Sequence, residues 1–164
     1  MTAGDYNRWS APFRTPGRAG AVRAVNRTLT LLCFLSYPLS LLWLLARADA
    51  RLWGCVALPG SGFLLVSLFR RRFNAPRPYE ALDIVPLMEK GKHGQSFPSR
   101  HVFSIFVIAM TLLRLCAPLG WVLLCCGVVL AWCRVILGVH FPRDVIAGGI
   151  AGILWGLPGF FLPL

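Results

Sequence analysis

The sequence predicts an all-α protein, a polytopic transmembrane helical bundle of about five spans with an interfacial arm at its N-terminus. Two observations lead to this prediction. The chain of 164 residues is 57% hydrophobic and only 14% charged, which is too apolar for a soluble domain of this size. Its charged residues also gather in a few stretches separated by long apolar runs, the pattern of membrane helices rather than of a soluble core.

The first 27 residues form the predicted arm. They carry five arginines among aromatic side chains, and Pro12, Pro16 and Gly17 interrupt any long helix. We expect the aromatic side chains to face lipid and the arginines to face headgroups; a disordered basic tail is the alternative. The predicted organisation is therefore an arm, residues 1–27, followed by a membrane-embedded domain, residues 28–164.

Five apolar runs follow, each close to the ~20 residues that a helix needs to cross a bilayer. Charged or turn-forming residues separate them, including a long polar segment between the second and third runs. The predicted spans cover about 28–46, 52–69, 99–117, 121–139 and the stretch from a polar break at 140–144 to about 162.

The last span carries Gly148, Gly152 and Gly156, one every four residues. Small residues at this spacing share one helix face and let a second helix approach closely. We expect this face to pack either within the bundle or between the two subunits of a homodimer, and to take no part in chemistry.

The net charge of +11 would also suit a nucleic-acid-binding protein, but such proteins carry their basic residues on a polar, soluble surface. Here the basic residues stand beside apolar spans, where they suit anionic headgroups or phosphate groups. We therefore expect membrane lipids as partners and no nucleic acid. The six cysteines lie in or beside apolar runs without the spacing of metal ligands, which indicates buried apolar residues rather than a disulfide framework or a zinc site.

Polar residues at the ends of the spans gather on one side of the membrane. The segment 70–101 lies between the second and third spans and the segment 134–144 between the fourth and fifth, so two crossings separate them. Polar side chains at membrane depth are costly and therefore indicate function. The candidate residues are Arg70, Arg77, Ser99, Arg100, His101, Arg134, His140 and Asp144.

Together these residue types suit a phosphoryl group. Guanidinium groups are permanently charged, planar donors that match phosphate oxygens. Pro98 suits the first turn of a helix, and the N–H groups of the next three residues would then point out of the helix start, where they bind an anion. One histidine can attack phosphorus while the other protonates the leaving oxygen. Asp144, four residues after His140, can reach back to orient it.

The order and spacing of these residues resemble the three signature blocks of the type 2 phosphatidic acid phosphatase superfamily, the lipid phosphate phosphatases. In that family the blocks are Lys, six residues, Arg-Pro; Pro-Ser-Gly-His; and Ser-Arg, five residues, His, three residues, Asp. Three blocks in register are a strong signal, whereas any single block is a weak one. In this sequence they read Arg70, then Arg77-Pro78; Pro98-Ser99-Arg100-His101; and Cys133-Arg134, then His140, then Asp144.

The resemblance implies an enzyme that needs no metal and no other cofactor. His140 would be the nucleophile that forms a phosphohistidine, Asp144 would orient it, and His101 would be the general acid for the leaving group. The phosphate-binding residues that the resemblance implies are Arg70, Arg77, Ser99, Arg100 through its backbone, and Arg134.

The sequence departs from the family's pattern in several places. Arg70 replaces a lysine and keeps its charge, Arg100 replaces a glycine, and Cys133 replaces a serine, so that a hydroxyl donor is lost there. Family members usually have six spans, whereas we count five. A metal site built from the two histidines and Asp144 is an alternative, although the arginines crowding the same place disfavour a cation.

Two other functions stay open at this point. A non-catalytic lipid-binding protein would keep the bundle but would need neither both histidines nor the aspartate. A lipid-linked phosphotransferase would pass the phosphoryl group to an acceptor other than water, and nothing in the sequence separates it from a hydrolase.

We expect an integral membrane protein of a bacterial plasma membrane, with a site near the headgroup level. The candidate substrates are undecaprenyl diphosphate, phosphatidylglycerol phosphate and phosphatidate, and the sequence does not choose among them. The side of the membrane also stays open. Fourteen of the 17 Lys and Arg residues lie on the site's side, which the positive-inside rule places in the cytoplasm, whereas bacterial relatives with six spans usually face outward.

Overall fold

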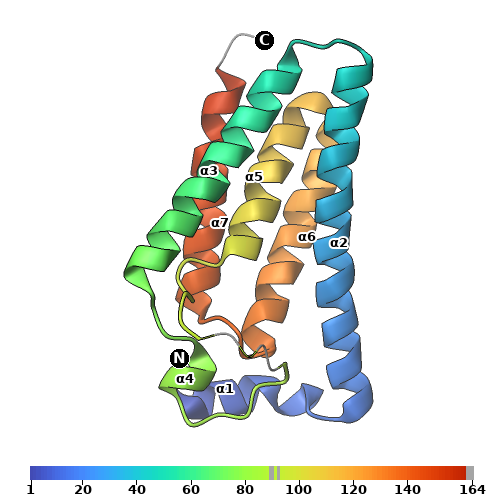
Figure 1. Ribbon diagram of the computed structural model, residues 1–164. Helices are drawn as coiled ribbons and strands as arrows, with labels where there is room; N and C mark the ends of the chain where they lie inside the picture. Colours follow the sequence, from blue (N-terminus) through green and yellow to red (C-terminus); the bar gives the residue numbers. More distant parts are fainter. Residues whose placement is uncertain (89–90, 92, 162–164) are drawn as a thin grey trace.

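The computed structural model describes residues 1–88, 91 and 93–161 of the chain. Every regular element in that part is helical, which confirms the predicted all-α class (Figure 1). The last three residues of the predicted domain, and Lys90 and Lys92 of the charge count, lie outside the described residues. The long helices are α2 (Pro16–Ala46), α3 (Arg51–Phe73), α5 (Arg100–Leu115), α6 (Ala117–Ile136) and α7 (Pro142–Gly156).

Short helices stand at the two ends of the bundle. One end is closed by three of them, and the fourth continues from the end of α7 (Figure 1). They are α1 (Ala3–Ser10), η1 (Ala11–Phe13), α4 (Pro78–Ala81) and η2 (Leu157–Phe160).

Three helical stretches of the described residues are long and apolar enough to cross a membrane: Pro16–Ala46, Arg51–Ala81 and Ala117–Ile136. Only 11% of the most apolar window of the first is buried within the protein, so its side chains need lipid around them rather than water. The protein is therefore an integral membrane protein. The helices α5 and α7 have 16 and 15 residues, shorter than the ~20 of a typical span, and the count of five spans stays a prediction.

The helix α5 forms the centre of the bundle. Most of its residues between Val102 and Leu112 are buried, among them Phe103 and Phe106. They pack against α6 and α7 on one side and against α2 and α3 on the other. Because α5 is enclosed by apolar neighbours, its first residues are held firmly at the end of the bundle where the polar segments meet.

The arm is folded rather than disordered, and α2 begins well before the predicted start of the first span. Pro16 stands in the first turn of α2, where its missing N–H costs nothing, and nothing beyond it stops the helix before Arg47. In α1, Tyr6 and Ser10 have no exposed surface. The Tyr6 hydroxyl donates to the carbonyl of Ile136 at 3.3 Å and accepts the N–H of Leu87 at 3.2 Å.

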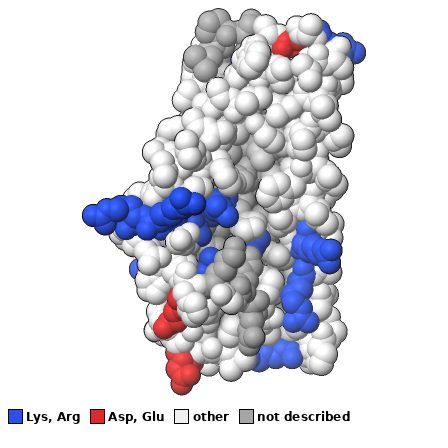
Figure 2. Space-filling model, in the orientation of Figure 1, with Lys and Arg blue, Asp and Glu red and all other residues white. Residues whose placement is uncertain are grey.

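The three polar stretches lie at the same end of the bundle, as the count of crossings predicts (Figure 1). Arg23 of α2 and Arg14 donate to the carbonyls of Leu87 and Val85 in the segment that follows α4. Figure 2 shows basic side chains gathered over the half of the molecule that holds this end, while mostly uncharged atoms cover the other half. The arm therefore fastens the segment after α4 to the end of α6.

The glycine face of the last span packs inside the chain, against α5. A Cβ atom at Gly148 would lie 2.6 Å from the carbonyl oxygen of Ser99, and one at Gly152 would lie 2.7 Å from that of Phe103. At Gly156 it would lie 2.4 Å from a side-chain carbon of Met110. Of the two alternatives, packing within the bundle is thus the one the structure shows, and this face is not open to a second copy of the chain.

Replacing Gly152 with alanine should destabilise the protein by about 1–3 kcal/mol, because backbone rather than a flexible side chain stands in the way of the new methyl group. Gly20→Ala is the matched control, since nothing lies within 4 Å of a Cβ there and alanine favours the helix. The measurement is thermal unfolding of both variants in detergent. Equal unfolding temperatures for the two variants would contradict this account of the α5–α7 contact.

Candidate active site

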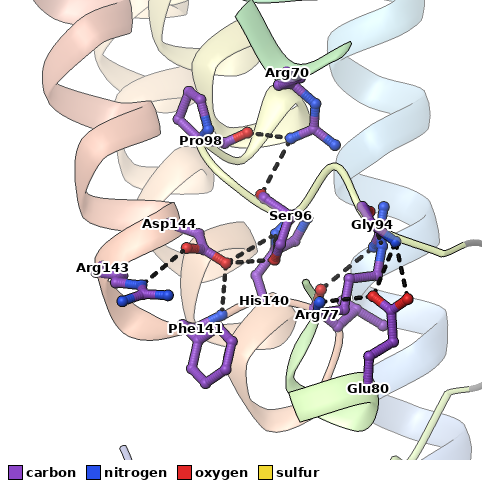
Figure 3. A network of polar contacts seen from close by, with 11 residues as sticks. Arg70, Arg77, Glu80, Gly94, Ser96, Pro98, His140, Phe141, Arg143 and Asp144 are labelled. Atoms are coloured by element: carbon purple, nitrogen blue, oxygen red, sulfur yellow. Dashed lines mark hydrogen bonds and ion pairs between the residues drawn. The ribbon is translucent and has the colours of Figure 1, made fainter. Parts of the chain in front are cut away.

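Four of the polar residues singled out in the sequence come together at the end of the bundle where α5 begins: Arg70, Arg77, His140 and Asp144 (Figure 3). Most of their side chains are buried although they are charged or polar. Each is positioned by the end of a helix, so the packing of the bundle sets their separation. Arg70 lies in the last turn of α3, Arg77 just before α4, Ser99 at the N-cap of α5, Arg134 in the last turn of α6, His140 between α6 and α7, and Asp144 in the first turn of α7.

Asp144 is held at the start of α7 by several contacts. Its Oδ2 atom accepts the backbone N–H of Phe141 at 2.9 Å, a contact favoured by the positive end of the helix dipole. The Nδ1 atom of His140 lies 3.6 Å from the same oxygen, within ion-pair range but longer than a hydrogen bond. The structure therefore brings Asp144 and His140 together, although less directly than the spacing predicts.

Ser96 fills the gap between these two side chains. Its hydroxyl donates to Asp144 Oδ2 at 2.5 Å and lies 3.4 Å from His140 Nδ1. Motif spacing does not indicate this residue, because Ser96 falls outside the three motif blocks, two positions before Pro98. With Nδ1 on the side of Ser96 and Asp144, the other ring nitrogen of His140, Nε2, is the one left for chemistry.

Burial lowers the pKa of His140 to about 4, and the positive charges of Arg77 and Arg134 act in the same direction, while Asp144 opposes them. The ring is 2% exposed, so the uncharged form is favoured. At neutral pH the imidazole is therefore neutral, the form in which a ring nitrogen has a lone pair to attack with.

Two arginines fix the backbone that leads into α5. Arg70 Nη1 donates to the carbonyls of Ser96, at 3.2 Å, and of Pro98. Arg77 donates to the carbonyls of Gly94 at 3.0 Å and Val139 at 3.3 Å. A guanidinium has five N–H groups, so each arginine keeps donors for an anion beyond these bonds.

Other buried polar atoms have no hydrogen-bond partner among the described residues. They include Ser99 Oγ and both Nε and Nη1 of Arg134, whose side chain is 1% exposed. A buried polar group without a partner costs about 1–3 kcal/mol, and hydroxyl and guanidinium donors in one place suit the oxygens of an anion. Of all the observations at the site, this one points most directly to a phosphate-like ligand.

The start of α5 differs from the prediction that Pro98 stands in the first turn of the helix and that the next three N–H groups face an anion. The helix begins at Arg100 with Ser99 as its N-cap, so Pro98 precedes the cap instead of standing in the first turn. The N–H of Ser99 donates to the carbonyl of Asp144 at 2.8 Å and is not available to an anion. An anion at this helix start would therefore meet the N–H groups of Arg100 and the residues that follow it.

Arg100 and His101 line an apolar cavity of about 320 Å³ next to the buried cluster. Its other walls come from α2, α3, α5 and α6, and the guanidinium carbon of Arg100 lies 5.1 Å from the centre of the Phe63 ring. In the part of the chain that the structure describes, no three His, Cys, Asp or Glu side chains gather as metal ligands do. The expectation that no metal is needed stays a prediction.

A model of the PAP2 superfamily matches residues 50–162, more than half of the chain and the part that holds every candidate residue. The chain belongs to the PAP2 superfamily. The resemblance drawn from the three motif blocks is thereby confirmed. The role of each individual residue in this PAP2 protein stays a prediction.

Several relatives match parts of this PAP2 chain. Undecaprenyl-diphosphatase BcrC of Bacillus subtilis is 27% identical over 132 residues, which cover 78% of this chain and 68% of the relative. The undecaprenyl-diphosphatase of Sulfolobus acidocaldarius is 35% identical over 77 residues, 46% of this chain and 37% of that protein. YbjG of Escherichia coli is 45% identical over 62 residues, 36% of this chain and 30% of that protein. The match thus spans only about a third of the last two relatives.

Two solved structures share the fold. LpxE of Aquifex aeolicus matches with a TM-score of 0.76 and 24% identity over 98% of this chain and 95% of that one. A transmembrane PAP2 type phosphatidylglycerolphosphate phosphatase from Bacillus subtilis matches with a TM-score of 0.62 and 22% identity over 95% of this chain and 90% of that one. At these identities the likeness establishes the fold of the whole bundle.

Replacing Arg134 with glutamine should weaken the binding of inorganic phosphate to the purified protein about 10–100-fold, because a charge-assisted hydrogen bond to a buried anion is lost. Titration calorimetry in detergent measures the change. Arg71→Gln is the control, since Arg71 lies exposed in the last turn of α3 and should leave the affinity unchanged. Equal affinities for wild type and Arg134→Gln would remove Arg134 from the phosphate site.

Proposed function

We propose that this protein is a metal-independent membrane phosphatase that hydrolyses a lipid phosphate or diphosphate through a phosphohistidine intermediate. The observation that carries the proposal is that a neutral, buried His140 lies with polar atoms of Ser99 and Arg134 that have no hydrogen-bond partner among the residues described. A nucleophile and an anion-binding set in one buried place are the two parts that phosphoryl transfer requires.

In the proposed first step, Nε2 of His140 attacks phosphorus and the bond from phosphorus to the leaving oxygen breaks. The electron pair of that bond goes to the leaving oxygen, which takes a proton from His101. Asp144 and Ser96 hold the Nδ1 side of His140 and stabilise its positive charge in the intermediate. Arg70, Arg77 and Arg134, with the N–H groups at the start of α5, neutralise the phosphoryl oxygens.

In the proposed second step, water attacks the phosphohistidine, the bond between nitrogen and phosphorus breaks, and inorganic phosphate leaves. His101, which has lost its proton in the first step, takes one from the attacking water. A lipid-linked phosphotransferase would differ only here, because its acceptor would be another hydroxyl or phosphate rather than water.

The surroundings of the site support a lipid as substrate. The apolar cavity beside Arg100 and His101 is bounded by helices that also face the bilayer, so a lipid can place its phosphate at the cluster and keep its apolar part out of water. Relatives are named as undecaprenyl-diphosphatases, and one structural neighbour is a phosphatidylglycerolphosphate phosphatase. We therefore propose polyprenyl diphosphates, phosphatidylglycerol phosphate and phosphatidate as the substrates to test.

Phosphate release from these three lipids by detergent-purified protein tests the proposal. We expect release that persists in EDTA and falls at least about 10⁴-fold in His140→Ala, since the nucleophile itself is removed. His93→Ala is the control, because His93 is an exposed loop residue whose contact is with Glu80. Release abolished by EDTA would indicate a metal enzyme, and no release from any lipid would favour a binding protein.

The low pKa of His140 predicts how the rate depends on pH. Because this pKa is about 4, kcat/KM should hold as the pH falls from 7 to about 5 and decline as it passes through about 4, where His140 gains a proton. In Ser96→Ala this decline should begin at higher pH, because a carboxylate that lacks the Ser96 hydroxyl favours the protonated ring more strongly. Ionisation of the substrate is titrated separately in the same micelles.

The same Ser96→Ala variant should also lower kcat about tenfold with little change in KM, and Ser96→Thr should restore part of the rate. A merely structural role would leave the acid side of the profile in place. An unchanged profile in Ser96→Ala would therefore show that Ser96 does not position His140 and Asp144.

A further inference from the structure

We infer that the side chain of Arg100 binds the lipid-bearing phosphate of a diphosphate substrate and so makes this enzyme favour lipid diphosphates over lipid monophosphates. The inference rests on the proposed function, which it narrows to one substrate class. Arg100 was expected to contribute only its backbone, because it stands where the family's second block has a glycine.

The side chain of Arg100 faces α3 and the apolar cavity. Its guanidinium lies against the ring of Phe63 on α3 and lines the apolar cavity together with His101. It is only partly exposed, and among the described residues it forms no hydrogen bond or ion pair with an acidic side chain. A guanidinium beside an apolar cavity in a membrane protein is costly without a partner, and such residues mark sites for anionic groups.

Successive residues at the start of α5 face different parts of the protein. Ser99 faces α7, where its N–H bonds to the carbonyl of Asp144 and its own carbonyl oxygen lies against Gly148. The next two residues, Arg100 and His101, line the cavity instead. A phosphoryl group bound at this helix start would therefore have His140 and Asp144 on one side and Arg100 and His101 on the other.

In phosphoryl transfer the attacking and leaving atoms stand roughly in line on opposite sides of phosphorus. With Nε2 of His140 as the attacking atom, the leaving group must lie toward the cavity. His101, the proposed general acid, already lines that side. Arg100 is the other charged side chain that lines it, so the leaving group passes close to its guanidinium.

The two substrate classes present different leaving groups to Arg100. A lipid monophosphate loses an alcohol, which is neutral once His101 has protonated it. A lipid diphosphate loses a lipid monophosphate: the bond from the bridging oxygen to the attacked phosphorus breaks, the electron pair stays on that oxygen, and the product keeps negative charge on its own phosphate. A guanidinium binds phosphate oxygens through paired N–H donors, so it stabilises the second leaving group far more than the first.

The test compares the diphosphate and the monophosphate of one polyprenol as substrates for the full chain in detergent. The quantity measured is the ratio of kcat/KM for the diphosphate to that for the monophosphate. We expect this ratio to fall at least about tenfold in Arg100→Gln, the loss of one charge-assisted contact. Arg100→Lys should keep part of the preference, because it keeps the charge without the planar pair of donors.

Arg72→Gln is the matched control, since Arg72 is an exposed arginine in the last turn of α3, and its ratio should equal that of wild type. A ratio that stays constant in Arg100→Gln overturns the inference. If Arg100→Gln does not purify as a folded protein, a ratio in Arg100→Lys equal to that of wild type overturns it as well. Failure of the proposed function would look different, because wild type would then release phosphate from neither lipid.

Discussion

The carboxylate of Asp144 has no exposed surface, and the contacts that stabilise its charge come from segments far apart in the sequence. Ser96, ahead of α5, donates a hydroxyl, and the turn before α7 donates the N–H of Phe141. The backbone carbonyl of Asp144 itself accepts the N–H of Ser99. The other carboxylate oxygen, Oδ1, has no hydrogen-bond partner among the described residues and lies 3.7 Å from Nε of Arg143. Because a buried charge is costly without such contacts, they require the start of α5, the start of α7 and His140 to meet at one place.

The remainder of the fold keeps that meeting point fixed. The glycines of α7 bring it so close to α5 that the two helices have little freedom to slide. On the other side, Tyr6 of α1 packs against Gly138, whose φ of +75° suits a glycine in the turn after α6. The same tyrosine bonds to Ile136 and Leu87. The N-terminal arm thus supports the segment that carries His140 from outside, a role that its basic, aromatic composition does not indicate.

The sequence predicts those features of the structure that depend on local residue patterns, and it does not predict those that depend on the path of the chain in space. The helices and their common polar end could be predicted because hydropathy is a local property and crossings can be counted. The convergence of Arg134, His140 and Asp144 could be predicted from motif spacing. Ser96 could not, because its role depends on the path of the chain from Gly94 to Ser99, which Arg70 and Arg77 fix through backbone carbonyls. The direction of the Arg100 side chain depends in the same way on a ring of another helix.

The charges of the site favour an anion over a metal ion, as the proposed metal-independent mechanism requires. Arg70, Arg77 and Arg134 lie in the same cluster as a neutral His140. The buried Asp144 carboxylate accepts two hydrogen bonds at Oδ2, while its Oδ1 atom has no hydrogen-bond partner among the described residues. A cation would be repelled by three fixed positive charges. A phosphate would be drawn in and would give acceptors to the donors that have no partner in the described part of the chain. Burial lowers the pKa of His140 most, and the charges of Arg77 and Arg134 lower it further. Two of the arginines proposed to bind the substrate would therefore also help to keep the proposed nucleophile unprotonated.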